Sequence, residues 1–387
     1  MKVAFYAPMK PTDHPVPSGD RALGQSLLRA LRTAGHGTFV ASRFRSFDGR
    51  GDATRQQRLQ VLGHRLAARL VRRLRHPATR PDLWFTYHLH HKAPDWLGPA
   101  VSHALDIPYV VAEASVATKQ SHGAWALGYA GSVAAIEAAA ATIFLNPVDL
   151  AGVRAVRGPA RADECVPPFL DLAAFAVGAS APAADVPLRS GRTRLITVAM
   201  MRPGAKLASY RLLAQALSQI TSPAWELVIV GDGEARGEVE AAFACFDPDR
   251  IRMVGFQHAP SVAAWLRASD IFVWPAVDEA FGMALIEAQA CGLPVVAGNG
   301  GGVAGVVASG RTGLLVPVGD AGAFAAAVLR LLTETQLRRK MASEAAAYAK
   351  SEHDLPAGAS RLDAVLRRVT AEYRQRAPIE PAPTAAR

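Results

Sequence analysis

The stretch IFVWPAVDEAFGMALIEAQACGLPVVAG, residues 271–298, predicts a strand, a helix and a second strand in succession. The apolar run at 271–274 is typical of a buried strand, and a second such run follows at 294–297. Between them, helix-forming residues run from near Phe281 to Gly292, where glycine followed by Leu-Pro is a stop signal. Strand, helix and strand in this order form one βαβ unit of a parallel sheet.

The same alternation of apolar runs and helical patterns continues along the whole chain. Further strands are expected over 3–6, 38–41, 83–87, 109–112, 142–145, 195–200, 227–230, 251–254 and 314–316. Strict alternation places the chain in the α/β class and predicts two Rossmann-like, doubly wound domains. Because such domains bind ligands at the carboxyl ends of their strands, we expect the two domains to face each other across a cleft.

Composition indicates where one domain ends and the next begins. Residues 172–192 are rich in Ala, Pro, Gly and Ser, which is typical of a linker. After residue 351 the pattern predicts one amphipathic helix, and the last residues show no periodicity. The expected organisation is an N-terminal domain over 1–180, a C-terminal domain over 190–350, a helix over 351–375 that packs back toward the N-terminal domain, and a disordered tail over 376–387.

Composition and cysteine usage exclude several classes of protein. Of the 387 residues 50% are apolar and 20% charged, so the chain can bury two cores and is not disordered overall. The three cysteines lie far apart without CxxC spacing, which argues against a disulfide framework or a zinc site and suits a reducing cytoplasm. The start MKVAFYAP is too short for a signal peptide, and Glu137 interrupts the longest apolar stretch, 128–145. We therefore expect a cytoplasmic protein without a membrane-spanning segment.

Two glutamates, Glu279 and Glu287, bracket an otherwise apolar stretch across the start of the expected helix. Isolated carboxylates are costly to bury, so each should meet a partner in the fold or a ligand. Their separation at the helical rise covers ~12 Å, about the span from the ribose of a nucleotide sugar to its sugar ring. The free N–H groups of Phe281, Gly282 and Met283 would point between the carboxylates, where a pyrophosphate fits. The alternative is plain helix capping, with Glu287 a solvated position.

The segment 271–317 resembles the donor-binding domain of retaining GT-B glycosyltransferases of family 4. After the paired glutamates, an EX7E motif, come EAQACGLPVV, a glycine-rich turn at 300–302, and GRTGLLVP. The likeness extends through VIVGDGEAR, residues 228–236, and VGFQHAPSVAAWLRASD, residues 254–270, and is looser in the N-terminal domain. It implies a hexosyl or glycosyl transferase that moves a sugar from a nucleotide-sugar donor to an envelope, lipid-linked or small-molecule acceptor. The resemblance also implies retention of the anomeric configuration, with no metal ion or other cofactor.

The resemblance assigns roles to charged residues of the donor domain. Arg202 and Lys206 follow the first strand of that domain and would contact the donor diphosphate, although the glycines that flank them in the family are missing here. Glu287 would bind ribose hydroxyls, and Glu279 would lie beside the transferred sugar. Arg202, Lys206 and Glu279 are thus the expected catalytic residues of this domain. The alternative for the two cations is an exposed basic loop.

Backbone groups complete the expected donor site. The N–H groups of Phe281, Gly282 and Met283 would bind the donor, and Gly282 would allow close approach because it has no side chain. The resemblance also implies that Gly231, in VIVGDGEAR, belongs to the donor site. The glycine-rich turn with Gly301 would allow close backbone packing near the donor.

In the N-terminal, acceptor-binding domain, the family places a glycine-rich loop after the first strand and often a histidine after the fourth. Gly19 in PSGDR occupies the loop position, whereas Ala114 in VVAEAS stands where the histidine is expected. The neighbouring Glu113 does not inherit that role. His88 and His90 in FTYHLHHK end another strand at the same edge and are candidates for the acceptor site, with His90 assigned to catalysis. The alternative is polar capping of the strand end.

The positive charge is concentrated in one segment. Of a formal charge of +10, eleven arginines and two aspartates between residues 43 and 80 contribute +9. Residues 54–75 predict a helix with its arginines, from Arg58 to Arg75, on one stripe and leucines beside it. Such a helix suits an anionic membrane surface, where each basic residue contributes about 1 kcal/mol. The alternative is an ordinary helix with leucines on the sheet and arginines in water. Nucleic acid is not expected, because no aromatic residues interleave with the arginines.

Other motifs suggest different functions. GGGVAG, residues 300–305, satisfies GxGxxG with Asp320 downstream, as in an NAD-dependent oxidoreductase, but only about two turns of helix fit before Gly310. Asp247 and Asp249 resemble a metal-binding DxD pair, although they more readily end a helix before the next strand. A sugar-nucleotide binding module without activity is the remaining alternative; the missing histidine favours it, and the retained ionic residues oppose it.

Overall fold

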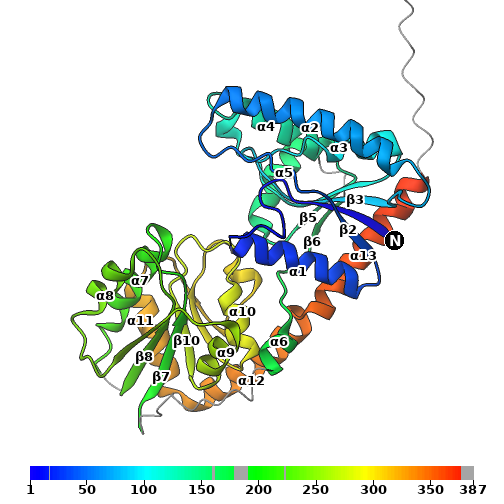
Figure 1. Ribbon diagram of the computed structural model, residues 1–387. Helices are drawn as coiled ribbons and strands as arrows, with labels where there is room; N and C mark the ends of the chain where they lie inside the picture. The colour runs from blue at the N-terminus through cyan, green and yellow to red at the C-terminus, as the bar shows by residue number, and fades with distance from the viewer. Residues whose placement is uncertain (17, 159–161, 178–190, 222–223, 376–387) are drawn as a thin grey trace, which may run out of the picture. The chain divides into compact units, whose positions relative to one another are not determined.

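The computed structural model describes residues 1–16, 18–158, 162–177, 191–221 and 224–375, which form two compact units (Figure 1). The first unit comprises residues 1–166 and the chain from Ala359 on, and the second comprises Pro167–Gly358. The second unit begins before the expected linker, because Leu170 and Leu172 pack against its core. Most of that linker, 178–190, and the predicted tail, 376–387, lie outside the described residues.

The first unit contains a sheet of six parallel strands in the order β2-β1-β3-β4-β5-β6. The strands are β1 (Lys2–Tyr6), β2 (Gly37–Ser42), β3 (Leu83–Leu89), β4 (Tyr109–Ala114), β5 (Ala141–Phe144) and β6 (Ala162–Cys165). One face is covered by α2 (Ala53–Leu74), α3 (Gly98–Leu105), α4 (Ala126–Ala138) and α5 (Leu150–Arg157), and the other by α1 (Gly19–Thr33) and α13 (Leu355–Gln375) (Figure 1). The 3₁₀ turns are η1 (Thr118–Gln120) and η2 (Pro147–Asp149). Because both faces are covered, the central strands are nearly continuous apolar runs.

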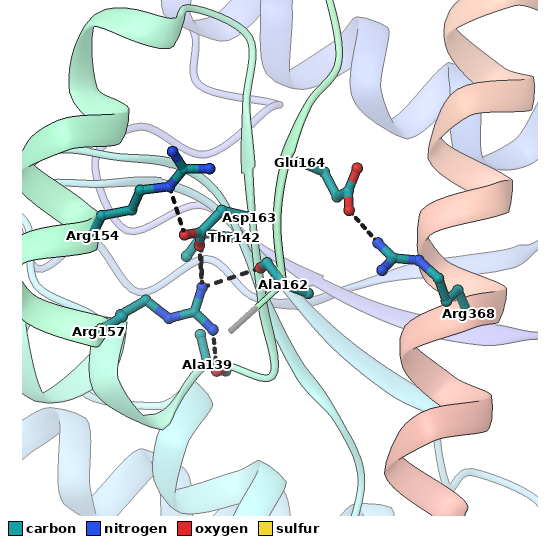
Figure 2. Close-up of polar contacts among 8 residues, drawn as sticks. All are labelled: Ala139, Thr142, Arg154, Arg157, Ala162, Asp163, Glu164 and Arg368. Atoms are coloured by element: carbon teal, nitrogen blue, oxygen red, sulfur yellow. Dashed lines mark hydrogen bonds and ion pairs between the residues drawn. The ribbon is translucent and has the colours of Figure 1, made fainter. Parts of the chain in front are cut away.

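Strand β6, at the edge of this sheet, was not predicted. Its residues ADEC include two acidic side chains, so no apolar run marks them. A buried arginine secures the strand: Arg157, the last residue of α5, donates to Asp163 Oδ1 (2.7 Å) and to Thr142 Oγ1 (2.8 Å), as Figure 2 shows. The same guanidinium donates to the Ala139 carbonyl (2.7 Å). Since the Arg157 side chain is wholly buried, these acceptors replace the water it loses.

Helix α13 begins in the second unit, at Leu355, and from Ala359 on it belongs to the first. The chain therefore passes between the units twice. Within the first unit, Arg368 of α13 contacts Glu164 of β6 (Figure 2). Asp363 of the same helix lies 3.1 Å from Nε2 of the buried His36. These contacts tie the last long helix to a unit built mainly from the first part of the chain.

The second unit contains another sheet of six parallel strands, in the order β12-β11-β10-β7-β8-β9. The strands are β7 (Thr193–Val198), β8 (Trp225–Val230), β9 (Ile251–Gly255), β10 (Ile271–Trp274), β11 (Val295–Gly298) and β12 (Gly313–Val316). One face is covered by α7 (Ala205–Leu217), α8 (Arg236–Phe243) and α11 (Ala321–Thr333), and the other by α6 (Leu172–Val177), α9 (Ala259–Arg267), α10 (Met283–Ala290) and α12 (Thr335–Glu352) (Figure 1). The predicted α/β class with two doubly wound, Rossmann-like domains is confirmed.

Each sheet has one place where the strand order reverses. In the first unit the chain leaves β1 toward β2 and then returns to place β3 on the other side of β1. In the second unit, β8 and β9 lie on one side of β7, and β10 to β12 lie on the other. The loops that follow the two strands at such a switch point diverge and leave room for a ligand. The switch points lie between β1 and β3 and between β7 and β10.

Candidate functional site

A lysine and a glutamate meet at the switch point of the second unit. Lys206 lies in the first turn of α7, which follows β7, and Glu279 lies in the loop that follows β10. The Lys206 Nζ donates to Glu279 Oε2 at 2.5 Å, with 29% and 15% of the two side chains exposed. Two of the residues expected to act together are therefore in direct contact, although 73 residues separate them in the sequence.

Two aromatic residues support this ion pair. Trp274, the last residue of β10, donates from Nε1 to Glu279 Oε2 (3.1 Å), and its ring lies 5.3 Å from Lys206 Nζ. Tyr210 of α7 packs edge-on against Trp274 and donates its hydroxyl to the Ala199 carbonyl (2.8 Å), just past β7. Sequence reasoning missed Trp274 and Tyr210, because both look like ordinary apolar positions of a strand and a helix. Only the tryptophan's place at the end of its strand gave a signal.

The helix after Glu279 begins later than predicted. Helix α10 starts at Met283, and Gly282 precedes it with a φ of 66°. The N–H groups of Leu285 and Ile286 donate to the Gly282 carbonyl (2.8 and 3.3 Å). The prediction that Phe281 opens the helix is therefore wrong, because glycine takes the left-handed conformation there and shifts the first turn by two residues. The helix dipole and the free N–H groups of the first turn accordingly begin at Gly282 and Met283.

Glu287 lies in the second turn of α10 and differs sharply from Glu279. Its side chain is half-buried, and no hydrogen bond or ion pair to it is found among the described residues. Burial raises the pKa of this carboxyl from its usual 4.5 to about 7. Glu279 thus has a cation as its partner, whereas Glu287 has a half-buried carboxyl group for which no partner is found among the described residues.

Two glycines allow the backbones of neighbouring loops at this site to pack closely against each other. A Cβ on Gly301, whose φ is +55°, would lie 1.9 Å from the carbonyl oxygen of Glu279, and the neighbouring Gly302 N–H donates to that oxygen (3.1 Å). A Cβ on Gly231, after β8, would lie 1.9 Å from the Ala199 carbonyl oxygen after β7. The glycine-rich turn therefore holds the Glu279 loop in place, which is the close backbone packing that was expected.

The remaining predicted residues of the second unit lie at the same edge of the sheet without joining the ion pair. Arg202 is exposed in the loop between β7 and α7, and no ion pair to its side chain is found in the described part of the chain. Phe281 is half-buried in the loop before α10. The Glu279 loop itself is strained, because Ala276 and Asp278 adopt left-handed φ values of 56° and 50° without being glycine.

The predicted residues of the first unit have different surroundings from one another. Gly19 opens α1, and a Cβ there would meet no atom within 4 Å, so packing does not require glycine at this position. His90 accepts a hydrogen bond from the Lys92 N–H (3.2 Å) and lies 3.9 Å from the ring of His91. Burial, together with the neighbouring charges, lowers the pKa of His90 to about 3. His88 instead contacts the carboxylate of Asp20. Of these two histidines, only His88 is found to contact a carboxylate among the described residues.

The rival motifs have structural explanations. Within GGGVAG the chain forms only the short 3₁₀ turn η4 (Val303–Gly305), and no helix follows before Gly310, so the long helix of a dinucleotide fingerprint is not formed. Asp247 and Asp249 close a turn before β9, in which the Asp249 N–H donates to Asp247 Oδ1 (2.8 Å). Within the described ranges, no group of three or more His, Cys, Asp and Glu side chains is arranged to hold a metal ion. No helix in those ranges is long and apolar enough to cross a membrane.

Two Rossmann-like units, each with a parallel six-stranded sheet, define the GT-B class of glycosyltransferase folds, and this chain has that fold. Sucrose-phosphate synthase from Thermosynechococcus elongatus matches with a TM-score of 0.68 at 20% identity, over 96% of this chain and 99% of that one. The Anabaena protein HepE, solved in complex with UDP-glucose, matches with a TM-score of 0.63 at 17% identity, over 95% of this chain and all (100%) of that one.

Sequence similarity is concentrated in the second unit. Residues 192–334 match the family described as Glycosyl transferases group 1. The D-inositol 3-phosphate glycosyltransferase of Jonesia denitrificans is 33% identical over 204 residues, which cover 48% of this chain and 46% of that protein. The chain thus matches less than half the length of this curated relative.

Proposed function

We propose that this protein is a glycosyltransferase that uses a nucleotide-sugar donor bound by its second unit. The Lys206–Glu279 contact carries the proposal: it places a cation and a carboxylate together at the switch point of a doubly wound sheet, where such folds bind ligands. This contact lies within the segment that matches the glycosyltransferase family. The Anabaena neighbour was solved with UDP-glucose, so UDP-sugars are the first donors to test.

The proposed donor site assigns one task to each group. The Lys206 ammonium has three N–H donors, of which one forms the hydrogen bond to Glu279. The other two can bind the diphosphate together with Arg202. The first N–H groups of α10 add positive potential on the opposite side of the diphosphate. Glu287, enclosed and without a partner among the described residues, accepts hydrogen bonds from the ribose hydroxyls. Glu279 then lies beside the sugar that is transferred.

The proposed reaction retains the anomeric configuration and needs no metal ion. The bond between the anomeric carbon and the diphosphate oxygen breaks while the acceptor hydroxyl oxygen bonds to the same face of that carbon. The hydroxyl proton passes to the departing diphosphate oxygen. Stabilising the diphosphate is the main electrostatic task, and Lys206, Arg202 and the first turn of α10 supply the positive charge. Turnover that is insensitive to EDTA is the expected result; loss of activity with EDTA would contradict metal independence.

Titration calorimetry with UDP and UDP-glucose tests the donor site, preceded by a thermal-shift screen of other nucleotide diphosphates. Replacing Lys206 by Met should weaken UDP binding about tenfold or more, because a charge-assisted hydrogen bond to phosphate is lost. Lys340 is exposed on α12, so Lys340→Met is the matched control and should bind UDP as the wild type does. Equal UDP affinity in wild type and Lys206→Met would refute the site.

A second measurement separates an enzyme from a binding module. Glu279→Gln keeps the size of the side chain but loses its charge, so it should still bind UDP while hydrolysis of UDP-glucose falls about tenfold or more. A wild-type protein that binds UDP-glucose and neither hydrolyses it nor transfers its sugar would favour the module without activity. Absorbance of a bound nicotinamide would instead favour the oxidoreductase alternative.

The three free cysteines support a cytoplasmic location for the activity.

We also propose that part of α2 faces an anionic membrane surface. Toward its end α2 behaves as an ordinary helix, because Leu70 and Leu74 are buried against the sheet. Close to its middle, however, Val61 and Leu62 are 49% and 46% exposed and line a surface hollow together with Arg58 and neighbouring residues. Apolar side chains beside arginines match the boundary between headgroups and acyl chains.

Sedimentation with lipid vesicles tests this surface. The wild type should bind vesicles containing phosphatidylglycerol and not purely zwitterionic ones, and Leu62→Gln should weaken that binding. Leu329→Gln on α11 is the matched control, because Leu329 is 38% exposed in the second unit. Equal binding to both vesicle types, or no loss with Leu62→Gln, would refute the membrane surface.

A further inference from the structure

The switch point of the first unit carries its own histidine and carboxylate. His88 lies near the end of β3, and Asp20 lies in the first turn of α1, which follows β1. His88 Nδ1 contacts Asp20 Oδ1, and the Tyr87 hydroxyl donates to the backbone carbonyl of Asp20 (3.3 Å). The contact joins the end of β3 to the helix that follows β1, at the position where doubly wound folds place a ligand.

The contact fixes the chemistry of the imidazole. A carboxylate can only accept a hydrogen bond, so the Nδ1 atom of His88 carries a proton and donates it to Asp20. The Nε2 atom takes no part in this contact and can form a hydrogen bond with another group. No partner for Nε2 is found among the described residues, and 33% of the His88 side chain is exposed. The ring is therefore oriented by the protein on one side and free to meet a ligand on the other. This is the arrangement by which proteins hold a histidine for work on a substrate.

The backbone at this place is held in an uncommon conformation. His88 has a φ of 62°, and Glu113, at the matching end of the adjacent strand β4, has a φ of 58°. Left-handed conformations cost energy for residues other than glycine and persist where the surroundings impose them. The Glu113 carboxylate accepts the N–H of Leu145 after β5, which ties the ends of two strands together. Both side chains are thus turned and fixed by the fold.

Carboxyl groups dominate the charges around His88. Burial opposes protonation of His88, but the hydrogen bond and charge of Asp20, with the charges of Glu113 and Asp149, outweigh it and raise the His88 pKa. Burial raises the pKa of Glu113 to about 7, against the hydrogen bond from Leu145 and the charge of His88. Asp149, in η2, is the third carboxyl group, and burial raises its pKa as well. Three carboxyl groups, those of Asp20, Glu113 and Asp149, therefore act on a single imidazole.

We infer that His88, oriented by Asp20, binds a hydroxyl group of the sugar acceptor, and that the part of the acceptor bound there is a polyol without negative charge. The inference rests on the proposed glycosyltransferase function and adds the acceptor's chemical class to it. A phosphate group next to the reacting hydroxyl would lie among three carboxyl groups and a single imidazole, and the excess of acidic groups would repel it. His88 is thus an acceptor-binding residue in a unit whose sequence resembles the family only loosely.

Transfer from UDP-glucose to glucose and myo-inositol, compared with glucose 6-phosphate and inositol 3-phosphate, tests both parts of the inference. The neutral acceptors should be used at least about tenfold better than the phosphorylated ones, because like charges repel in this site. His88→Asn and Asp20→Asn should raise the KM for the neutral acceptor about tenfold or more and leave kcat within about twofold. UDP affinity should stay unchanged in both variants, which distinguishes acceptor binding from misfolding. His103→Asn, at an exposed position of α3, is the matched control.

Direct binding to the imidazole supplies an independent readout. In protein labelled with ¹⁵N-histidine, glucose or myo-inositol should shift the His88 Nε2 resonance, and the phosphorylated compounds should not. Preference for the phosphorylated acceptors, an unchanged KM in His88→Asn, or a His88 resonance that ignores every neutral polyol would overturn the inference. Failure of the proposed glycosyltransferase function gives a different result, in which the wild type binds neither UDP nor UDP-glucose. The resonance experiment then still shows whether His88 binds a neutral polyol.

Discussion

Replacing Glu287 by Gln should stabilise the ligand-free protein and weaken donor binding at the same time. In the folded protein this carboxyl is half-buried, and no hydrogen bond or ion pair to it is found in the described ranges. Burial raises its pKa from 4.5 to about 7, so the charged form is costly in the fold. Gln has the same shape without the charge, and it removes that cost. If Glu287 binds the donor as proposed, the carboxylate lowers the stability of the wild type and serves the ligand.

The size and pH range of the effect follow from the pKa. The unfolded chain releases the Glu287 proton near pH 4.5, and the folded protein holds it until about pH 7. The unfolded state binds fewer protons between these values, so the stability of the wild type falls as the pH rises through this window. At about 1.4 kcal/mol per pKa unit the full shift is about 3 kcal/mol, which partial exposure reduces to about 2 kcal/mol.

Urea denaturation of wild type and Glu287→Gln at about pH 5 and about pH 8 measures this difference. The variant should gain about 2 kcal/mol over the wild type between the two pH values, and its affinity for UDP should fall about tenfold. Glu238 is exposed on α8, so Glu238→Gln is the matched control and should show no such pH dependence. A Glu287→Gln variant whose stability relative to wild type is the same at both pH values would refute the reasoning.

Two further substitutions probe the framework around the sites. Gly301→Ala should lower the melting temperature and UDP affinity together, because its Cβ would overlap a carbonyl oxygen at 1.9 Å; Gly305→Ala, with no atom within 4 Å of its Cβ, should change neither. Equal melting temperatures for the two variants would contradict the close packing of the loops. Arg157→Met should lower the free energy of unfolding by ~3–5 kcal/mol, because the buried Asp163 carboxylate loses its buried partner and keeps only an exposed one. The exposed Arg154, 3.5 Å from the same carboxylate, should cost less than about 1 kcal/mol when replaced by Met; similar losses from both arginines would show that burial does not set the energy.

Most of the fold could be predicted because parallel sheets bury their central strands on both faces. Runs such as Ile271–Trp274 are continuous and apolar for that reason, and the observed strand β10 coincides with the predicted one. Strand β6 was missed because an edge strand has only one neighbour and tolerates polar residues. The start of α10 was misplaced for a local reason: Gly282 takes a left-handed conformation that no apolar pattern reveals.

The candidate sites were predictable in composition and not in geometry. The spacing of Glu279 and Glu287 identified both as candidate site residues. Whether each carboxylate has a partner, however, depends on residues that are distant in the sequence. Lys206 reaches one of them and no described residue pairs with the other. In the first unit, alternation along β3 could not separate His88 from His90, because a left-handed residue turns the strand end. Only the position of Asp20 on α1 makes that distinction.

The double crossing of the chain between its units determines how the protein can be taken apart. The second unit is one uninterrupted segment, Pro167–Gly358, whereas the first is assembled from two segments at opposite ends of the chain. A fragment that stops at Val166 loses the helix that contacts Glu164 and His36. Isolating the first unit therefore requires either coexpression of its two segments or a linker that joins Val166 to Ala359.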